Sequence, residues 1–174
     1  AFDGTGDYFS MTDSDDWDVV GSVDDYTIDM WVKHDNHVGS ENYISQEEDT
    51  QNLWYFYHAH GTGLRFAVYS NDAYIVDTVG GGEIADTNWH HVAMVKSGTT
   101  YTVYKDGDIV TSITDPSTDT FTGNFEIGAG SGSVYIDGNI DELRILKGRA
   151  LTIEEIKAAA ERRPYAVYTS QVID

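Results

Sequence analysis

Cysteine is absent from the 174-residue chain, and proline occurs only twice. Without cysteine the chain forms no disulfide bond, binds no metal through thiolates and has no cysteine nucleophile. Basic residues are also scarce, because ten Lys and Arg stand against thirty Asp and Glu, a formal net charge of −20. A surface this acidic repels phosphate backbones and anionic headgroups, so we expect no nucleic-acid partner. No stretch approaches the roughly 18–20 apolar residues that cross a bilayer, so we expect no membrane insertion.

Aromatic residues, by contrast, are abundant. They make up 13% of the chain, and hydrophobic residues make up 40%. This content is enough for a sizeable core and argues against the disorder that a high net charge predicts at low hydrophobicity. One compact domain is the default for this length. Cations, neutral glycans and basic proteins are the partners that the charge allows.

Turn residues divide the chain into short β-prone runs. Their spacing of about 8–12 residues is typical of an all-β sandwich. Two hairpins are expected, at Asp106-Gly107 and at Asp137-Gly138. The expected strands are Tyr8–Met11, Tyr26–Lys33, Asn42–Gln46, Leu53–His58, Leu64–Ser70, Tyr74–Val79, Trp89–Lys96, Thr100–Lys105, Ile109–Thr114, Asn124–Gly128, Ser133–Asp137 and Ile140–Leu146.

One short helix is expected near the C-terminus. Thr152 and Glu155 have the spacing of a capping box, and Pro164 ends the helix. Residues Tyr165–Asp174 have the composition of one more strand. We therefore divide the chain into a domain over 1–163 and a trailing strand, linker or start of a following domain over 164–174. The trailing strand pairs with its own sandwich or with a neighbouring domain or copy, and the second is favoured.

Five segments occur in an order that resembles a known family. They are Phe2–Tyr8, Tyr26–Lys33, Trp89–Ala93, Tyr104–Gly107, and Gly138–Ile145 leading into Arg149–Thr152. The series resembles the laminin-G-like jelly-roll domains of the concanavalin A-like lectin/glucanase superfamily, over about residues 2 to 163. This resemblance implies an all-β fold, a two-sheet antiparallel jelly-roll sandwich with one short C-terminal helix and a trailing strand. It does not fix the function, because the fold carries lectins, hydrolases and adhesion domains.

The resemblance also implies a saccharide platform on the concave face of one sheet. Aromatic rings stack on sugar rings there, and polar side chains bind the hydroxyls. The best supply of such residues is the run from Leu53 to His60. Side chains alternate along a strand, so only one set can face solvent. The candidates are Tyr55 and Tyr57 with Arg65 and Tyr69 nearby, or alternatively Trp54 and His58.

A structural calcium ion is the second expectation that the resemblance carries. It would join the N-terminal strand to the strand with the Asp-Glu pair, through Asp3 and Asp141 with Gly4 and Asp7 nearby. Oxygen ligands of this kind suit Ca²⁺. The alternative is that Asp3-Gly4 is a turn and that Asp141 is a hydrogen-bonded residue at a strand edge.

Catalysis is not expected. Hydrolases of this superfamily carry Glu-x-Asp-x-Glu or Glu-x-Asp-x-x-Glu, whereas here Glu47-x-Asp49 is followed by Gln51 and Asn52. The second carboxylate of a glycosidase pair is missing. The leading hypothesis is a non-catalytic, extracellular, carbohydrate-binding module of a larger secreted, cell-surface or phage-tail protein, whose partner is a polysaccharide or glycan. The alternatives are a structural or adhesive module that contacts protein and, third, a divergent glycoside hydrolase.

Overall fold

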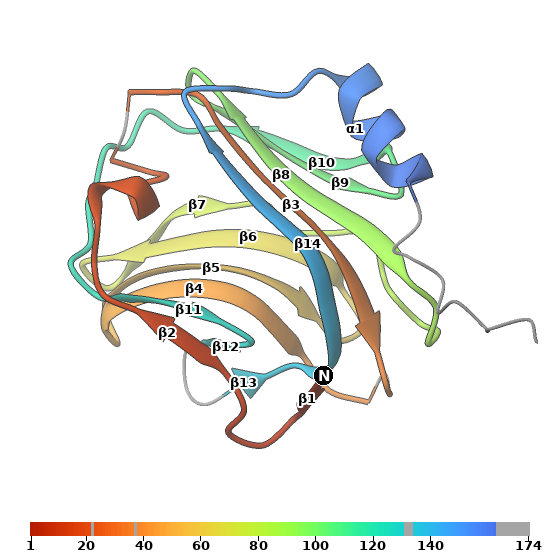
Figure 1. Cartoon of the computed structure of the whole chain (residues 1–174). Helices are drawn as coiled ribbons and strands as arrows, with labels where there is room; N and C mark the ends of the chain where they lie inside the picture. Colours follow the sequence, from red (N-terminus) through yellow and green to blue (C-terminus); the bar gives the residue numbers. More distant parts are fainter. Residues whose placement is uncertain (22, 37, 131–133, 163–174) are drawn as a thin grey trace, which may run out of the picture.

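The computed structural model describes residues 1–162 except 22, 37 and 131–133. Two six-stranded sheets, here called sheet A and sheet B, pack face to face (Figure 1). Every strand pair named in either sheet is antiparallel. The expected two-sheet all-β sandwich with one short helix is therefore confirmed. The trailing strand expected at 164–174 lies outside the described residues.

Each sheet has a simple spatial order. Sheet A contains β1 (Phe2–Asp3), β14 (Asp137–Lys147), β3 (Tyr26–His34), β8 (His90–Ser97), β9 (Thr100–Lys105) and β10 (Asp108–Thr114). Sheet B contains β2 (Phe9–Met11), β11 (Asn124–Ile127), β4 (Glu41–Asp49), β5 (Asn52–Ala59), β6 (Gly63–Ser70) and β7 (Ala73–Asp77). The remaining elements are a short pair, β12 (Ala129–Gly130) and β13 (Val134–Tyr135), the 3-10 turn Asp15–Trp17, and α1 (Ile153–Glu161).

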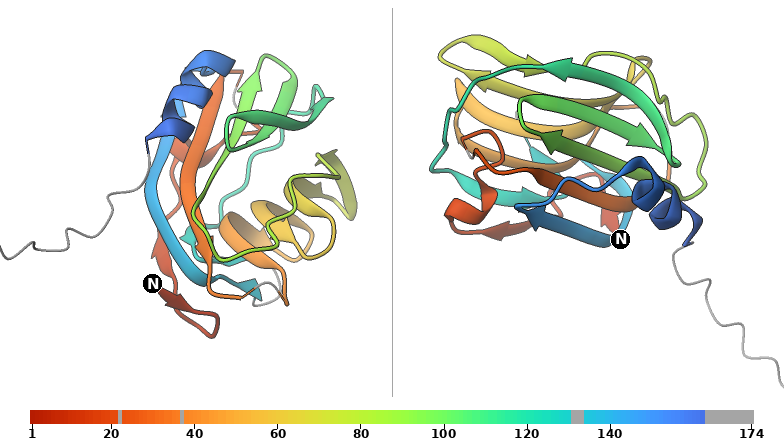
Figure 2. Two further views of the ribbon diagram at one scale, coloured as in Figure 1. Left: turned by 90° about the vertical axis from the view of Figure 1, so that its right-hand side faces the viewer. Right: turned by 90° about the horizontal axis from the view of Figure 1, so that it is seen from above.

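The local signals for the β9–β10 hairpin and the helix are confirmed. Asp106 and Gly107 join β9 to β10 with positive φ angles of 52° and 87°, the backbone that an Asp-Gly hairpin turn requires. The Thr152 side chain accepts a hydrogen bond from the Glu155 amide, and the Glu155 side chain accepts one from the Thr152 amide. Ile156 of α1 is fully buried against the outer face of sheet A, the face turned away from sheet B (Figure 2).

The hairpin expected at Asp137-Gly138 is wrong. β14 runs without a break from Asp137 to Lys147 and pairs with β3 along this length, apart from a bulge between Asp141 and Arg144. Glycine at 138 serves close packing rather than a turn. A Cβ atom built there would lie 2.0 Å from the Lys33 carbonyl oxygen.

The main core lies between the two sheets. At one end of the core, a buried hydrogen-bond network surrounds Gln46. Trp54 is 1% exposed and its Nε1 donates to Gln46 Oε1 at 2.9 Å. The Gln46 Nε2 lies 2.9 Å from Asp13 Oδ1, 2.8 Å from the Phe121 carbonyl and 3.2 Å from the Gly123 carbonyl. One buried amide therefore joins the core tryptophan to two loops that close the sandwich.

The opposite end of β4 contains a buried carboxylate. Glu41 is 3% exposed, and its Oε2 accepts a hydrogen bond from the Asp137 amide at 2.6 Å. Burial raises the pKa of Glu41, the hydrogen bond from Asp137 lowers it, and the negative charges of Asp137 and Asp35 raise it again, to about 7 overall. Glu41 is therefore partly protonated near neutral pH in the folded protein.

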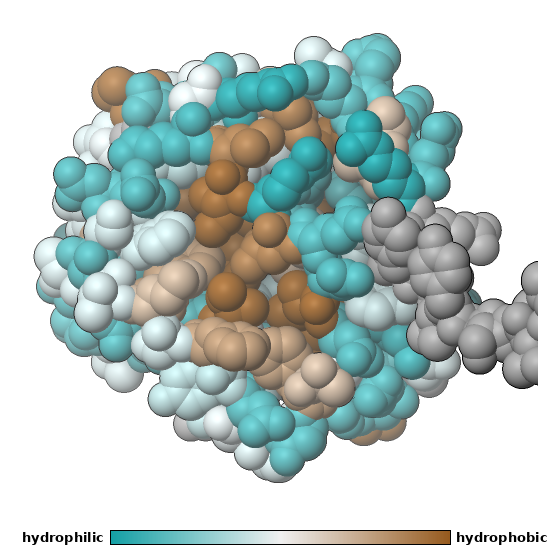
Figure 3. Space-filling view, viewed as in Figure 1, coloured by the Kyte–Doolittle hydropathy of each residue, from teal (hydrophilic) through white to brown (hydrophobic). Residues whose placement is uncertain are grey.

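An apolar groove lies where the edges of the two sheets face each other. It has a volume of about 300 Å³ and is lined mainly by Phe2, Phe9, Ile127, Ile140 and Leu143. Figure 3 shows apolar side chains gathered in the middle of this side of the molecule. Among the described residues, no helix is long and apolar enough to cross a membrane.

Replacing Gln46 is expected to destabilise the fold. In Gln46→Leu, the Trp54 indole and the loop carbonyls lose their buried hydrogen-bond partner, at a cost of about 3 kcal/mol in the free energy of unfolding. Urea unfolding followed by tryptophan fluorescence measures this loss. Gln51→Leu is the matched control, because Gln51 is exposed and its side chain hydrogen-bonds only Asp72 among the contacts described. Equal stability of Gln46→Leu and the native chain would contradict the role given to Gln46.

The pH dependence of stability provides a second prediction. The folded pKa of Glu41, about 7, lies above its ordinary value of 4.5, so Glu41 costs no stability below pH 4.5. The cost grows as the pH rises toward 7 and levels off near about 3 kcal/mol above it. Glu41→Gln removes this cost because glutamine does not ionise.

We therefore expect Glu41→Gln to become more stable relative to the native chain as the pH rises from 4.5 to 8. Thermal melts across this range measure the change, with Glu161→Gln on the exposed end of α1 as a control for the lost charge. A difference between Glu41→Gln and the native chain that stays constant with pH would overturn this assignment.

Candidate functional site

Tyrosine side chains gather on the outer face of sheet B. In the register of the sheet, Tyr57 lies opposite Arg65, and Tyr69 lies between Leu53 and Tyr74. Tyr55 lies opposite Ala67, a residue too small to cover its ring. Side chains two residues apart share a face, so this register places Tyr55, Tyr57 and Tyr69 together. The strands β4 and β5 arch so that the hollow side of the sheet faces away from sheet A (Figure 1).

The rings of this cluster contact one another directly. The centroids of Tyr55 and Tyr57 lie 4.8 Å apart, and those of Tyr69 and Tyr74 lie 5.0 Å apart, both edge to face. The hydroxyls of Tyr55 and Tyr74 are 3.0 Å apart and share a hydrogen bond. Tyr74 is 49% exposed, so the cluster opens to solvent on the β7 side. We call Tyr55, Tyr57, Tyr69 and Tyr74 the tyrosine face.

Arg65 is fixed within the tyrosine face by an acidic partner. Its Nε and one terminal nitrogen donate to the two carboxylate oxygens of Asp77. The other terminal nitrogen donates to the Tyr57 hydroxyl at 2.8 Å, and the guanidinium lies 4.9 Å from the centroid of the Tyr74 ring. The positive charge is therefore balanced, while the guanidinium keeps N–H groups beyond those that these bonds use.

The hydroxyls of Tyr55 and Tyr57 hold their protons more firmly than an exposed tyrosine, because the pKa of each is raised. Burial raises the pKa of Tyr55, as do the hydrogen bond to Tyr74 and the charge of Tyr57, whereas Arg65 lowers it. Burial also raises the pKa of Tyr57 above its ordinary value, against the lowering effect of Arg65. Both side chains therefore stay protonated, and Tyr57, whose oxygen accepts from Arg65, can donate its proton to a ligand.

Two cavities flank Tyr55. One, of about 210 Å³, is lined by Ser40, Asn42, Tyr55, Tyr57 and Val134. The other, of about 250 Å³, is lined by Thr50, Leu53, Tyr55, Tyr69 and Tyr74. Asn42 is 3% exposed, and its Oδ1 has no hydrogen-bond partner among the described residues. A buried acceptor without a partner costs free energy, so Asn42 is a polar residue of the cavity wall whose hydrogen-bonding capacity the described residues leave unused.

The structure separates the two sets of sugar-binding candidates. Tyr55, Tyr57, Arg65 and Tyr69 lie together on the outer face, as one alternative expected. Trp54 and His58 do not, and their expected place on the platform is wrong. Both point into the core, because they alternate with Tyr55 and Tyr57 along β5. His58 is fully buried, and its Nε2 accepts a hydrogen bond from the Ile84 amide at 3.1 Å.

Sequence reasoning missed four residues of this site: Ser40, Asn42, Tyr74 and Asp77. A signal for Tyr74 was present. Asn71 and Asp72 form a two-residue turn with φ angles of 50° and 66°, which pairs Tyr69 with Tyr74 across the β6–β7 hairpin. No such local signal existed for Ser40 and Asn42, because their place depends on the path of the chain from β3 to β4.

Two carboxylates, Glu47 and Glu126, lie on neighbouring strands of the same face. Glu126 pairs with Ser45, two residues from Glu47 on β4. Burial raises the pKa of Glu126, as does the negative charge of Glu47. Burial and the charge of Asp49 raise the pKa of Glu47. This edge of the face is therefore acidic.

The residues expected to bind calcium do not converge on one point. The register places Asp3 opposite Asp137, four positions along β14 from Asp141 and thus about 13 Å away. The Asp3 carboxylate accepts hydrogen bonds from Thr5, across a turn where Gly4 has a φ of 74°, and Asp141 accepts one from the Glu142 amide. The exposed Asp7 lies in the loop before β2. Within the described ranges, no group of three or more His, Asp or Glu side chains could hold a metal. Calcium binding stays a prediction.

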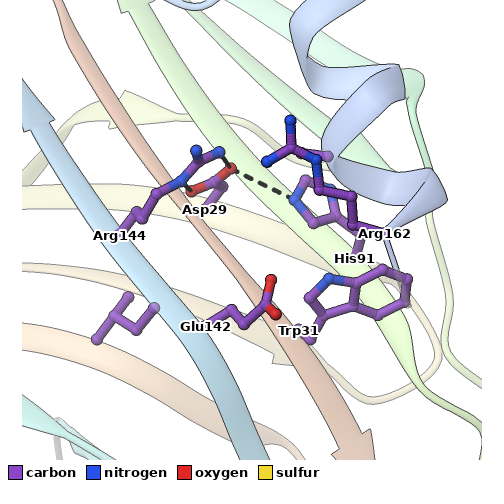
Figure 4. A pocket seen from close by; sticks show the side chains of 8 residues that line it. Asp29, Trp31, His91, Glu142, Arg144 and Arg162 are labelled. Carbon is purple, nitrogen blue, oxygen red and sulfur yellow. Dashed lines mark hydrogen bonds and ion pairs between the residues drawn. The ribbon is translucent and has the colours of Figure 1, made fainter. Parts of the chain in front are cut away.

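A further cavity, of about 290 Å³, lies on the outer face of sheet A beside the C-terminal end of α1. Figure 4 shows the Asp29 carboxylate between the Arg144 guanidinium and the His91 ring. Arg144 donates to both Asp29 oxygens, and His91 Nε2 lies 3.4 Å from Oδ2. Burial raises the pKa of Asp29, but the bonds from Arg144 and His91 outweigh it and lower the pKa overall. These groups bond to one another across β3, β8 and β14, which gives them a structural role.

Comparison with known proteins agrees with the fold. A family model described as the concanavalin A-like lectin/glucanases superfamily matches residues 3–157. No curated protein sequence shows a significant match.

Several solved structures are similar to this chain. One is domain 4 of AbnA, a GH43 extracellular arabinanase from Geobacillus stearothermophilus, in complex with arabinotriose. It has a TM-score of 0.69 at 19% identity and covers 92% of this chain and 87% of its own. Another is the CBM40 of the Ruminococcus gnavus IT-sialidase bound to α2,3 sialyllactose, with a TM-score of 0.63 at 14% identity over 87% of this chain and 96% of its own. At these identities the likeness is one of fold.

Proposed function

Because the chain belongs to the concanavalin A-like lectin/glucanases superfamily, we propose that it is a non-catalytic carbohydrate-binding module whose site is the tyrosine face. The observation that carries this proposal is the cluster of four tyrosine rings around a neutralised arginine on a hollow sheet surface. The same fold binds glycans elsewhere, since the two similar structures hold arabinotriose and sialyllactose.

The chemistry of the face suits a sugar. Pyranose and furanose rings have apolar C–H surfaces that pack on aromatic rings, and their hydroxyls need donors and acceptors around the rim. Tyr55 and Tyr57 supply both, because their rings are half-buried and their hydroxyls stay protonated. Arg65 adds fixed N–H donors without an unbalanced charge.

The absence of catalysis is part of the proposal. Glycoside hydrolysis needs an acid and a second carboxylate on opposite sides of the scissile bond. The Glu-x-Asp-x-Glu pattern of the superfamily's hydrolases stays incomplete here, because Gln51 and Asn52 stand where the second Glu would be, which supports a binding role over a catalytic one. Release of reducing ends from a β-glucan or an arabinan, abolished by Glu47→Gln, would overturn this part.

We further propose that the module works outside the cell, within a larger secreted, cell-surface or phage-tail protein. The arabinanase to which the similar domain belongs is described as extracellular. The acidic surface, with a net charge of −20, is compatible with neutral polysaccharides at such a location.

Removing one tyrosine should abolish most of the binding. On a glycan array we expect the native chain to retain at least one oligosaccharide, and Tyr55→Ala to bind it at least tenfold more weakly, since ring stacking of this kind contributes about 0.5–1.5 kcal/mol per ring and Tyr55 also supports its neighbours.

Tyr8→Ala is the matched control, because Tyr8 is 48% exposed, lies between β1 and β2 and lines neither of the cavities beside Tyr55. Circular dichroism verifies that both variants fold. If Tyr8→Ala and Tyr55→Ala bind alike, the site assignment fails. If the native chain retains no glycan, the structural or adhesive role replaces the proposal.

A further inference from the structure

We infer that the tyrosine face takes a neutral, linear oligosaccharide that lies along β5 and enters both cavities flanking Tyr55. This inference rests on the proposed function and adds the class of sugar, its length and its direction. Three observations carry it: the shared position of Tyr55, the polar groups at the far end of each cavity, and the charge around the face.

Tyr55 forms a wall of both cavities. The first cavity reaches Tyr57 and the second reaches Leu53, and these residues are four positions apart on β5, or about 13 Å. Each cavity is smaller than the roughly 300 Å³ at which sites for drug-sized ligands begin, so each suits a single ring. A ligand that uses both must be a chain of linked rings that passes over Tyr55.

Polar groups stand at both ends of this path. In the first cavity, Asn42 Oδ1 has no partner among the described residues, and the exposed Ser40 hydroxyl accepts a hydrogen bond from the His60 amide at 3.2 Å. The Ser40 proton therefore remains available to a ligand. In the second cavity, Thr50 is exposed in the turn between β4 and β5. Hydroxyl-rich rings can bond at each end while the tyrosines contact the middle.

The charge of the face selects against acidic sugars. Asp77 already balances the charge of Arg65 with both oxygens, so a carboxylate on the ligand would meet no net positive charge there. Glu47 on β4 and Glu126 on β11 are separated from this ion pair by β5, and the whole chain carries a net charge of −20. A neutral hydroxyl can accept a hydrogen bond from a remaining N–H of Arg65 without bringing a further negative charge to the face.

Length dependence is the first test. We expect the affinity of the native chain, measured by titration calorimetry, to rise at least tenfold from one to about three linked units and then to level off, since the path is about 13 Å long. The probes are arabino-, xylo-, cello- and laminari-oligosaccharides of one to six units. Equal affinity at all lengths would overturn the inference but leave the proposed function intact, whereas no binding to any glycan would overturn the function itself.

Variants at each end make the test specific. Tyr74→Ala removes one wall of the second cavity. Ser40→Tyr places a bulky ring in the first cavity, at a position that is exposed and so tolerates a larger side chain. Each should flatten the rise with length, so that the longest ligand loses more affinity than the shortest one. Asn42→Leu removes the unpartnered acceptor and should act like Ser40→Tyr; because Asn42 is buried, its melting midpoint must be measured as well. If these variants weaken all lengths equally, the two cavities do not act as separate subsites.

A charged ligand of matched length tests the selection by charge. We expect oligogalacturonides to bind at least tenfold more weakly than galacto-oligosaccharides of equal length at low salt, with the gap narrowing as salt screens the acidic groups. Glu126→Gln should narrow the same gap without changing the binding of neutral sugars. Equal or tighter binding of the acidic series would overturn the neutral class.

Discussion

The alternation of side chains along β5 is the constraint on which the rest of this structure depends. Trp54, Phe56 and His58 point inward and are buried, whereas Tyr55 and Tyr57 point outward and remain half-exposed. One strand thus builds the core with one set of residues and the candidate site with the other. A shift of register by one residue would bury the tyrosines and expose the tryptophan, so the core and the site specify the same register.

Gln46 strengthens this constraint from the core side. It pairs with Trp54 across the β4–β5 ladder, and the adjacent pair in the same ladder is Ser45 with Tyr55. The amide of Gln46 holds the indole and two loop carbonyls, so the backbone beneath Tyr55 is fixed from within. Ser45 is itself buried and donates to the Ala129 carbonyl at 2.9 Å. The tyrosine face therefore rests on a supported sheet, which limits the ordering cost that a ligand must meet.

Much of the fold could be predicted from local signals. The Asp106-Gly107 turn and the capping box at Thr152 are each set by a few neighbouring residues, and both are confirmed. The hairpin expected at Asp137-Gly138 is wrong. An Asp-Gly pair looks the same in the sequence whether its glycine forms a turn or lies in a strand where a neighbouring backbone comes close. Only the approach of β3, with the Lys33 carbonyl over Gly138, distinguishes the two.

The site was harder to predict from the sequence than the fold, because it too depends on contacts between segments that are distant in the chain. The alternation of side chains along a strand separates Trp54 and His58 from Tyr55 and Tyr57. It does not show which set faces inward, since both sets contain aromatic rings. Packing in the core decides it, because Trp54 is 1% exposed and its ring contacts Phe66 and Phe125 of strands β6 and β11 on the inner face of sheet B. Asn42 belongs to the site only because β4 has a bulge between Asn42 and Ile44. A bulge re-aims one side chain and leaves no trace in composition, so the residue with the unpartnered acceptor was the least predictable from the sequence.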